Sequence, residues 1–337
     1  MHTGPHSKEH RQVLQTPARS TVENVLEARD ISRLYKSSGR GIEGVSVSIA
    51  PGEVFGLMGP NGSGKSTLLR VLTTAMPPDG GSFRLGGIDA LADQQRARAK
   101  VGIMVDRPTH YGDLSGWANA YFFARAYGME KKRANSTLAE LFEYFDLAEY
   151  RDDKSKTYSY GMGKKLALIE ALAHAPELLL LDEPSLGLDY TSQLSYQRRV
   201  REQAAAGTAI LIASNQVDEV EALCDRVAFL HKGQMIAEGA PQDLIESLQG
   251  IKRIVATLRN PVEYEPLLSV EGVQQITPEG RDLVVHTDER RGIVAAVVAG
   301  IVECGGDIVD LHVRQPNLED VYVKLTGEAL QEEVGPR

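Results

Sequence analysis

The chain has 337 residues, of which 42% are hydrophobic and 25% are charged, proportions that are ordinary for globular proteins of about two domains. Its formal net charge of -9 argues against nucleic acid as the main partner, and no apolar run reaches the roughly 20 residues that cross a bilayer. The two cysteines, Cys224 and Cys304, lie far apart in apolar segments, which favours a reducing compartment and argues against a disulfide framework.

Residues 1–22 are polar and irregular, and we expect a mostly disordered tail there, without the apolar core of a signal peptide. His2, His6 and His10 are spaced four apart, which on one helix would align three imidazoles for a metal ion. Because Gly4 and Pro5 interrupt such a helix, a solvated tail is the better interpretation.

From Asn24 to about Gly239, β-rich segments alternate with helices, which is typical of a layered α/β domain. A helical block with aromatic residues at helical spacing interrupts the strands from Trp117 to about Tyr150, and we expect most of these aromatics in a core. The predicted strands are Val25–Arg29, Gly44–Ile49, Val54–Met58, Gly81–Leu85, Val101–Val105, Leu178–Leu181, Ala209–Ala213 and Val227–Leu230.

A linking helix is predicted near Pro241–Gln249, and the character of the sequence changes at Gly250. The remainder predicts a small ferredoxin-like α+β module. We therefore expect a tail at 1–22, the main domain at 23–249 with a helical part at about 112–172, and the module at 250–330. Its predicted strands are Lys252–Leu258, Asp282–Thr287 and Asp307–Val313, and its predicted helices are Gly292–Cys304 and Asn317–Leu325.

A glycine-rich loop follows the third predicted strand and fits the pattern G-x-x-x-x-G-K-[ST]. In such a loop several backbone N–H groups converge on phosphate oxygens, and the following helix N-terminus favours the same anion. Lys65 would reach the β- and γ-phosphates, and the Ser66 hydroxyl would bind Mg²⁺. A glycine-rich turn without a ligand fits this strand, loop and helix less well. The candidate nucleotide-binding residues of the loop are Gly59, Pro60, Asn61, Gly62, Ser63, Gly64, Lys65, Ser66 and Thr67.

Two carboxylates end the apolar strand Leu178–Leu181. Asp182 at the strand tip can hold the Mg²⁺ shell, and Glu183 is placed to polarise an attacking water. A buried strand capped by solvated acids is the alternative interpretation. It is less persuasive for Asp-Glu-Pro after four leucines in a chain that also has the phosphate loop.

The ordered motifs of residues 24–245 resemble those of ATP-binding cassette (ABC) transporter ATPase subunits. The resemblance implies a P-loop NTPase fold with a mixed sheet core, an antiparallel β subdomain and a helical subdomain. Tyr35 falls where the family has an aromatic that stacks on adenine. Tyr158–Met162 occupies the place of the family signature, and Ser185–Asp189 matches a loop whose aspartate crosses the dimer interface.

The family chemistry implies that each ATP lies between the phosphate loop of one cassette and the signature of a second. Ser159 would then hydrogen-bond the γ-phosphate, while Gly161 and the helix start offer N–H groups to the same anion. Asp189 would face the partner cassette. Whether that partner is another copy or a different cassette stays open.

Two further segments resemble the ATPases of small bacterial exporters that have separate membrane-spanning subunits. They are Leu114–Gly128 and the closing segment Gln315–Gly327. The resemblance implies an integral membrane partner that docks on the helical block, and a peripheral location on the inner face of the cell membrane. The cargo, as well as the direction of transport beyond the resemblance, stays open.

Two positions depart from the family on the catalytic side of the site. Asp106 replaces a glutamine; it still offers an oxygen to Mg²⁺ but adds negative charge near the triphosphate. Asn215 replaces a histidine that contacts the γ-phosphate, and it donates only a neutral hydrogen bond. We expect that ATP binding survives and that hydrolysis is slow. Tyr160, where the signature has glycine, carries little weight.

Other functions remain as alternatives. A regulatory subunit could bind ATP and leave turnover to an orthodox cassette in a heterodimer, which the two departures favour and intact Glu183 disfavours. A cassette ATPase acting on ribosomes or DNA would show a second fused cassette or a long coiled-coil insert, and the sequence has neither. The short basic runs at 96–100 and 131–133 are better read as solvated helix faces.

Overall fold

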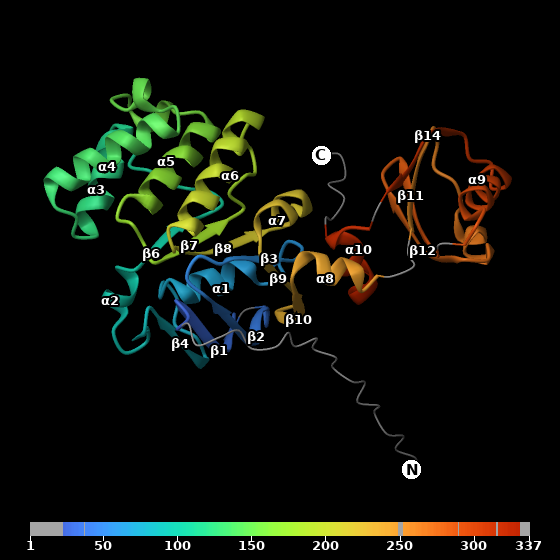
Figure 1. The fold of residues 1–337 in the computed structure, drawn as a ribbon, viewed down its shortest axis with the longest axis horizontal. Coiled ribbons are helices and arrows are strands. Elements are labelled where there is room, and N and C mark those ends of the chain that lie inside the picture. The colour runs from blue at the N-terminus through green and yellow to red at the C-terminus, as the bar shows by residue number, and fades with distance from the viewer. Residues whose placement is uncertain (1–22, 37, 249–251, 289, 315, 331–337) are drawn as a thin grey trace, which may run out of the picture. The chain divides into compact units, whose positions relative to one another are not determined.

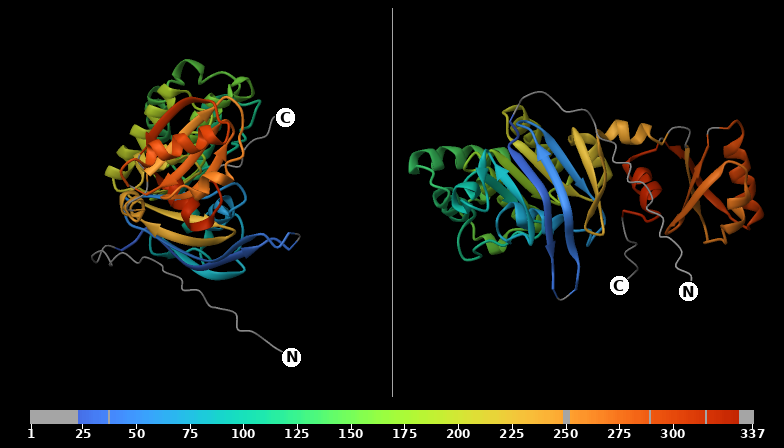
Figure 2. Two further views of the ribbon diagram at one scale, coloured as in Figure 1. Left: turned by 90° about the vertical axis from the view of Figure 1, so that its right-hand side faces the viewer. Right: turned by 90° about the horizontal axis from the view of Figure 1, so that it is seen from below.

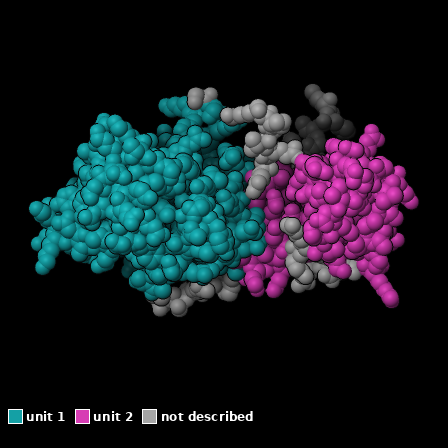
Figure 3. Space-filling view, turned by 90° about the horizontal axis from the view of Figure 1, so that it is seen from above, with its two compact units in different colours: residues 1–240 teal, residues 241–337 magenta. Residues whose placement is uncertain are grey.

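The computed structural model describes residues 23–36, 38–248, 252–288, 290–314 and 316–330. The chain divides into two compact units, residues 1–240 and 241–337 (Figure 3). The division precedes the boundary expected at residue 249, because helix α8 (Pro241–Glu246) contacts helix α10 (Leu318–Thr326) of the second unit. The expected tail with its three histidines, and the end of the linking helix at Gln249, lie outside the described residues.

The first unit contains an antiparallel sheet with the strand order β2-β1-β4-β5. Its strands are β1 (Leu26–Leu34), β2 (Gly41–Ile49), β4 (Gly80–Leu85) and β5 (Ile88–Asp89). Strands β1 and β2 alternate between buried and exposed residues over much of their length, so one face of this sheet is covered and the other meets solvent.

The second sheet of this unit is mixed and has the order β10-β9-β3-β8-β7-β6. Its neighbours pair in parallel except for the antiparallel edge strand β10. Every residue of β3, β7 and β8 is buried, because helices and the other sheet cover both faces of these strands. The strands are β3 (Val54–Met58), β6 (Val101–Met104), β7 (Leu178–Asp182), β8 (Ala209–Ser214), β9 (Arg226–His231) and β10 (Gln234–Gly239).

Helix α1 packs between the two sheets, and its apolar residues Leu68, Leu69, Val71 and Leu72 join strands of both sheets in one core cluster. Helices α3, α4 and α5 gather at one end of the unit, away from the antiparallel strands (Figures 1 and 2). The helices are α1 (Lys65–Leu72), α2 (Gln94–Arg98), α3 (Gly116–Ala126), α4 (Lys131–Tyr144), α5 (Tyr160–Leu172), α6 (Tyr190–Ala205) and α7 (Val217–Leu223), with 3-10 helices η1 (Ala148–Tyr150) and η2 (Ser155–Thr157).

The second unit holds an antiparallel sheet with the order β12-β13-β11-β14. Helix α9 packs on one face of it through Ile293, Val297 and Ile301. The unit has one strand more than the three predicted there, β12, and the connection before that strand holds a short 3-10 helix, η3. The elements are β11 (Lys252–Leu258), η3 (Glu265–Ser269), β12 (Val273–Glu279), β13 (Asp282–Thr287), α9 (Ile293–Glu303), β14 (Ile308–Arg314) and α10.

All strands predicted from the sequence are present, with ends that shift by up to several residues. Three strands were not predicted: β5, β10 and β12. Strand β12 lacks an apolar alternation and contains Pro278, so its sequence gives no strand signal. Within the described ranges, no helix is long and apolar enough to span a bilayer.

Candidate nucleotide-binding site

Four neighbouring parallel strands end at the same edge of the mixed sheet, and candidate residues follow each end. Gly59 follows β3, Asp106 lies just beyond β6, Asp182 ends β7, and Asn215 follows β8. Ligands of open α/β sheets bind at the carboxyl ends of the strands. The topology therefore brings motifs that are far apart in sequence to one place.

The loop between β3 and α1 requires glycine at two of its positions. A Cβ on Gly59 would lie 2.2 Å from the Leu230 carbonyl oxygen. At that distance any residue other than glycine would clash with the backbone. Gly64 has φ of 116°, a conformation that favours glycine, and it caps the N-terminus of α1. The loop can therefore turn tightly and leave the first N–H groups of α1 open to an anion.

Lys65 is buried at the start of α1, with 6% of its surface exposed. Its Nζ donates to the Gly59 carbonyl, and it lies 3.4 Å from the Pro60 carbonyl oxygen and 3.6 Å from Glu183 Oε1. Burial lowers the pKa of Lys65, against the opposing charges of Glu183 and Asp182. A buried ammonium held largely by neutral carbonyls is well suited to an anionic ligand.

Of the two carboxylates at the end of β7, Asp182 is buried and Glu183 is partly buried, with 12% of its side chain exposed. Burial raises the pKa of Asp182, against the hydrogen bond from Ser66 and the charge of Lys65. Burial likewise raises the pKa of Glu183, against the charge of Lys65 and the Asn215 N–H, which lies 3.4 Å from Glu183 Oε2. The Glu183 Oε1 atom is buried and accepts no hydrogen bond from the described residues. This oxygen is free to bind a water or a ligand.

These groups line a pocket of about 330 Å³. Tyr35 joins them from the end of β1, and its hydroxyl oxygen lies 3.5 Å from Thr67 Oγ1 and 3.4 Å from an Arg70 guanidinium nitrogen. The Thr67 hydrogen bond lowers the pKa of the Tyr35 phenol, with a smaller contribution from Arg70. The lining residues are Tyr35, Ser38, Arg40, Gly41, Pro60, Asn61, Gly62, Gly64, Lys65, Ser66, Thr67, Asp106, Asp182 and Glu183. Sequence reasoning missed Ser38, Arg40 and Gly41, because a hairpin of the antiparallel sheet brings them here and no motif marks them.

Three predicted site residues do not line the pocket. Ser159 caps the N-terminus of α5, where its hydroxyl oxygen accepts from the Met162 N–H at 3.2 Å. Gly161 lies in the first turn of that helix. Asp189 caps α6, and hydrogen bonds from Thr191 and Ser192 hold the pKa of its carboxyl well below its usual range.

Three more predicted residues lie beside the pocket without lining it. Gly59 contributes the carbonyl that accepts from Lys65, and Ser63 has a buried hydroxyl without a hydrogen-bond partner among the described residues. Asn215 approaches Glu183 through its backbone N–H.

Lys164 of α5 is a site residue that sequence reasoning missed. Its side chain is fully buried, and its Nζ donates to the Glu183 carbonyl and lies 3.7 Å from Asp106 Oδ1. Burial lowers the pKa of Lys164, and the Asp106 charge opposes that shift. The extra negative charge of Asp106 is therefore balanced inside the same chain. The sequence signals only the burial of Lys164, which is spaced i, i+4 and i+7 with the buried residues Leu168 and Ala171; its contacts with Asp106 and Glu183 have no sequence signal.

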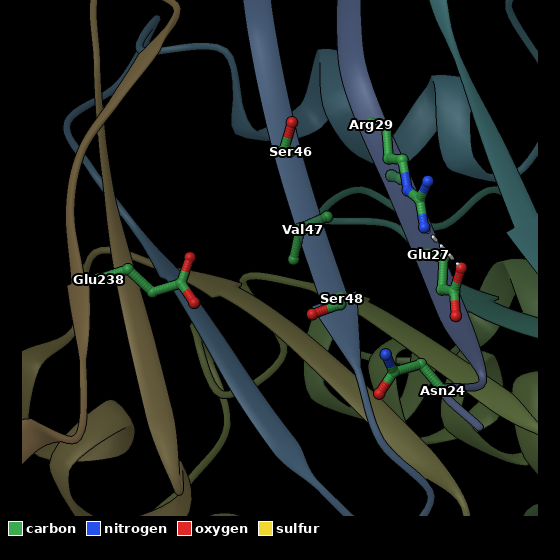
Figure 4. Close-up of a pocket in the computed structure, with 8 residues that line it drawn as sticks. Asn24, Glu27, Arg29, Ser46, Val47, Ser48 and Glu238 are labelled. Atoms are coloured by element: carbon green, nitrogen blue, oxygen red, sulfur yellow. Dashed lines mark ion pairs between the residues drawn. The ribbon is translucent and has the colours of Figure 1, made fainter. Parts of the chain in front are cut away.

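A second hollow of similar volume lies on the antiparallel sheet, close to β10 (Figure 4). Most of its side chains are polar, and Arg29 within it forms an ion pair with Glu27 at 3.5 Å. It has neither a glycine-rich loop nor a buried lysine, and we assign it no nucleotide.

The phosphate loop, the paired carboxylates and their shared edge agree with comparisons to known proteins. A family described as "ABC transporter" matches residues 42–186. The linearmycin resistance ATP-binding protein LnrL of Bacillus subtilis (strain 168) is 32% identical over 312 residues, which cover 91% of this chain and 100% of that protein. This chain belongs to the ABC transporter family. It is an ATP-binding subunit, and its ATPase activity is coupled to transport.

Two further comparisons extend this assignment. The Nod factor export ATP-binding protein I of Paraburkholderia xenovorans (strain LB400) is 34% identical, covering 90% of this chain and 99% of that protein. A solved structure of an ATP-binding subunit of an ABC transporter superposes with a TM-score of 0.63 at 28% identity, covering 66% of this chain and 92% of that one. The predicted ABC cassette fold is therefore confirmed. The resemblance to full-length relatives reaches into the second unit, whereas this structural match spans about the length of the cassette.

Proposed function

We propose that this ABC ATPase drives an exporter, and that it works on a separate integral membrane subunit from the inner face of the cell membrane. The observation that carries the proposal is that buried Lys65, buried Asp182 and partly buried Glu183 line one pocket at one edge of the mixed sheet, beside the glycine-rich loop. Relatives that are named for drug resistance and for Nod factor export support the direction of transport.

Three oxygen-bearing side chains would hold Mg²⁺ in this pocket. Ser66, Asp106 and Asp182 all line it, and hydroxyl and carboxylate oxygens are the ligands that this hard cation prefers. The fit is supported by Asp106 Oδ1, a buried oxygen that accepts no hydrogen bond from the described residues. When bound, Mg²⁺ neutralises charge on the β- and γ-phosphates.

The remaining side chains would bind ATP and orient the attacking water. Lys65 and the loop N–H groups would hold the terminal phosphates, and Tyr35 would stack on adenine. Glu183 would hold the water through its free Oε1, and its raised pKa makes the carboxylate a better proton acceptor.

A second ABC cassette would complete the site. Ser159, Gly161 and Asp189 lie outside the pocket of their own chain, which supports a role toward the nucleotide held by a partner. That partner is either a second copy or a different cassette.

Turnover is expected to be slow because the γ-phosphate lacks a cationic donor at position 215. The Asn215 N–H reaches Glu183, and a neutral amide replaces the imidazole of the family. Loss of one transition-state donor typically lowers rates about 10²–10³-fold. Asn215→His is therefore expected to raise the Glu183-dependent ATPase rate about tenfold or more. An unchanged or lower rate would show that this position does not limit turnover.

The nucleotide site itself is tested by Lys65→Ala. We expect the affinity for Mg·ATP, measured by calorimetry, to fall at least about 100-fold, because several charge-assisted hydrogen bonds are lost. Lys132→Ala, at an exposed lysine of α4, is the matched control and should bind as the native chain does. Equal affinity of the two variants would contradict the assignment of the pocket.

A further inference from the structure

Strand β14 forms one end of the sheet in the second unit, and its outer edge is open. It has seven residues and pairs only with β11 among the described strands. The opposite end strand, β12, carries Pro278 and a register shift between Val273 and Gln275, features that hinder pairing. Strand β14 contains no proline and no lysine. It has a register shift of its own against β11, at Val309 between Ile308 and Asp310, so the unprotected part of its edge runs from Asp310 to Arg314.

The backbone at the centre of β14 faces this open edge. The Leu311 N–H is bonded to the carboxylate of its neighbour Asp310 at 2.8 Å, so it does not donate to β11. Hydrogen-bonding directions alternate along an antiparallel strand, so Val313 presents its N–H and C=O to the same edge. Val313 and Val309 are also 51% and 54% exposed, so one exposed valine lies on each side of Leu311.

The sequence of β14 is complementary to itself when two copies run antiparallel about Leu311. In that register Val309 lies opposite Val313 of the second copy, and Asp310 lies opposite His312. Within one chain Asp310 and His312 already contact each other at 2.8 Å, and both are 55% exposed. Hydrogen-bonding and apolar pairs directly across two strands stabilise their pairing, whereas a parallel arrangement would align the Asp310 carboxylate with itself.

We propose that two copies of this chain associate through β14, antiparallel and centred on Leu311, so that one sheet runs through both C-terminal units. The interface is isologous, because each copy offers the same strand to the other. The Asp310 carboxylate turns from its own Leu311 N–H to His312 of the second copy, and the freed N–H groups pair across the axis. This contact needs no nucleotide and is separate from the proposed cassette sandwich, so its failure would leave the ATPase assignment untouched.

Charge reversal tests the register on the full chain without nucleotide. Sedimentation velocity over a range of concentrations should show a reversible dimer. His312→Asp places two carboxylates opposite each other and should weaken the dimer about tenfold or more. The double variant Asp310→Arg/His312→Asp places opposite charges across the two strands and should restore association. Val302→Asp adds the same charge at a residue of α9 that is 59% exposed and should have no effect.

Cross-linking gives a second measurement that does not depend on these charges. Cα atoms of a hydrogen-bonded antiparallel pair are about 5.5 Å apart, within the range that disulfides span. In a Cys304→Ser background, Leu311→Cys should therefore form a disulfide-linked dimer under mild oxidation, and Val302→Cys should form far less. A chain that is monomeric at every concentration, a dimer that His312→Asp leaves unchanged, or equal cross-linking of the two cysteine variants would overturn the proposal.

Discussion

Each compact unit buries a cluster of charged side chains, and the carboxylates of the two clusters differ in how many of their oxygens are engaged. In the C-terminal cluster, formed by Arg253, His286 and Asp320, His286 Nε2 lies 2.6 Å from Asp320 Oδ1 and Arg253 Nε lies 3.5 Å from the same oxygen. The other Asp320 oxygen accepts from the Asn317 N–H in the capping box of α10. Both carboxylate oxygens are therefore engaged.

In the nucleotide pocket the carboxylates are left open. Lys65 comes no closer than 3.6 Å to Glu183 Oε1, and that oxygen accepts no hydrogen bond from the described part of the chain. A buried charge without a partner is unfavourable, so it persists in folded proteins mainly where a bound ligand supplies the missing partner. The comparison teaches that burial and charge alone do not mark a binding site. A pocket lined by carboxylate oxygens that accept no hydrogen bond does.

The largest expected effect is on the C-terminal cluster, because both oxygens of its buried carboxylate are engaged. Asp320→Ala removes the acceptor of a buried arginine and histidine, and breaking such a pair typically destabilises by about 3–5 kcal/mol. Denaturant unfolding of the full chain should show this loss in the transition of the second unit, while ATP affinity is unchanged. Asp307→Ala, at an exposed aspartate, is the control. A loss below about 1 kcal/mol would mean that the cluster does not hold α10 in place.

A smaller effect is expected for the pair that balances charge beside the nucleotide pocket. Lys164→Met strands Asp106 beside the triphosphate and should weaken ATP binding about tenfold, a coupling within the usual range for contacting residues. Adding Asp106→Asn should recover most of that loss, as calorimetric titration of the single and double variants would show. Lys165→Met, at the next residue of α5, serves as the control. If the two changes simply add, the carboxylate and the ammonium are not coupled.

The smallest effect concerns a buried pair that titrates. His110 Nδ1 lies 3.1 Å from Glu170 Oε1 and its Nε2 lies 3.0 Å from the Gly163 carbonyl oxygen, so only the protonated ring can donate to both. Burial opposes protonation, yet the hydrogen bonds and the Glu170 charge raise the pKa of His110 overall. Its stabilisation is therefore complete below the unfolded pKa of about 6.5 and is lost as pH rises through the higher folded pKa.

Unfolding experiments between pH 5 and pH 9 would measure this dependence. His110→Gln should reduce stability at low pH by about 1 kcal/mol, the typical contribution of a hydrogen bond, and should flatten the decline toward high pH. An identical pH profile for the variant and the native chain would show that the ring is neutral in the folded state.

Much of the fold could be predicted from the sequence because the strands of the mixed sheet are continuous apolar runs. Strand β3 was predicted with its observed ends, and β7 differs only by Asp182 at its tip. The predicted strand ends also placed Asp106, Asp182 and Asn215 at one edge of the mixed sheet, because each residue comes just after or at the end of a parallel strand. The roles of these residues stay predictions.

Other features depend on packing that no local pattern reports. Lys164 lies on α5, and only the packing of this helix brings its Nζ to the Asp106 carboxylate and to the Glu183 backbone carbonyl. The boundary between the units falls before α8, because α8 contacts α10 of the second unit. This contact joins segments far apart in the sequence, and the composition of the linking residues does not reveal it.

The cap at the start of α5 has a consequence for how two cassettes would meet. The Ser159 oxygen accepts the Met162 N–H through one lone pair, and its own proton remains available. The hydroxyl can therefore terminate its helix and donate to an incoming phosphate at the same moment. Opening and closing the seam between two cassettes would then require no local refolding at this residue.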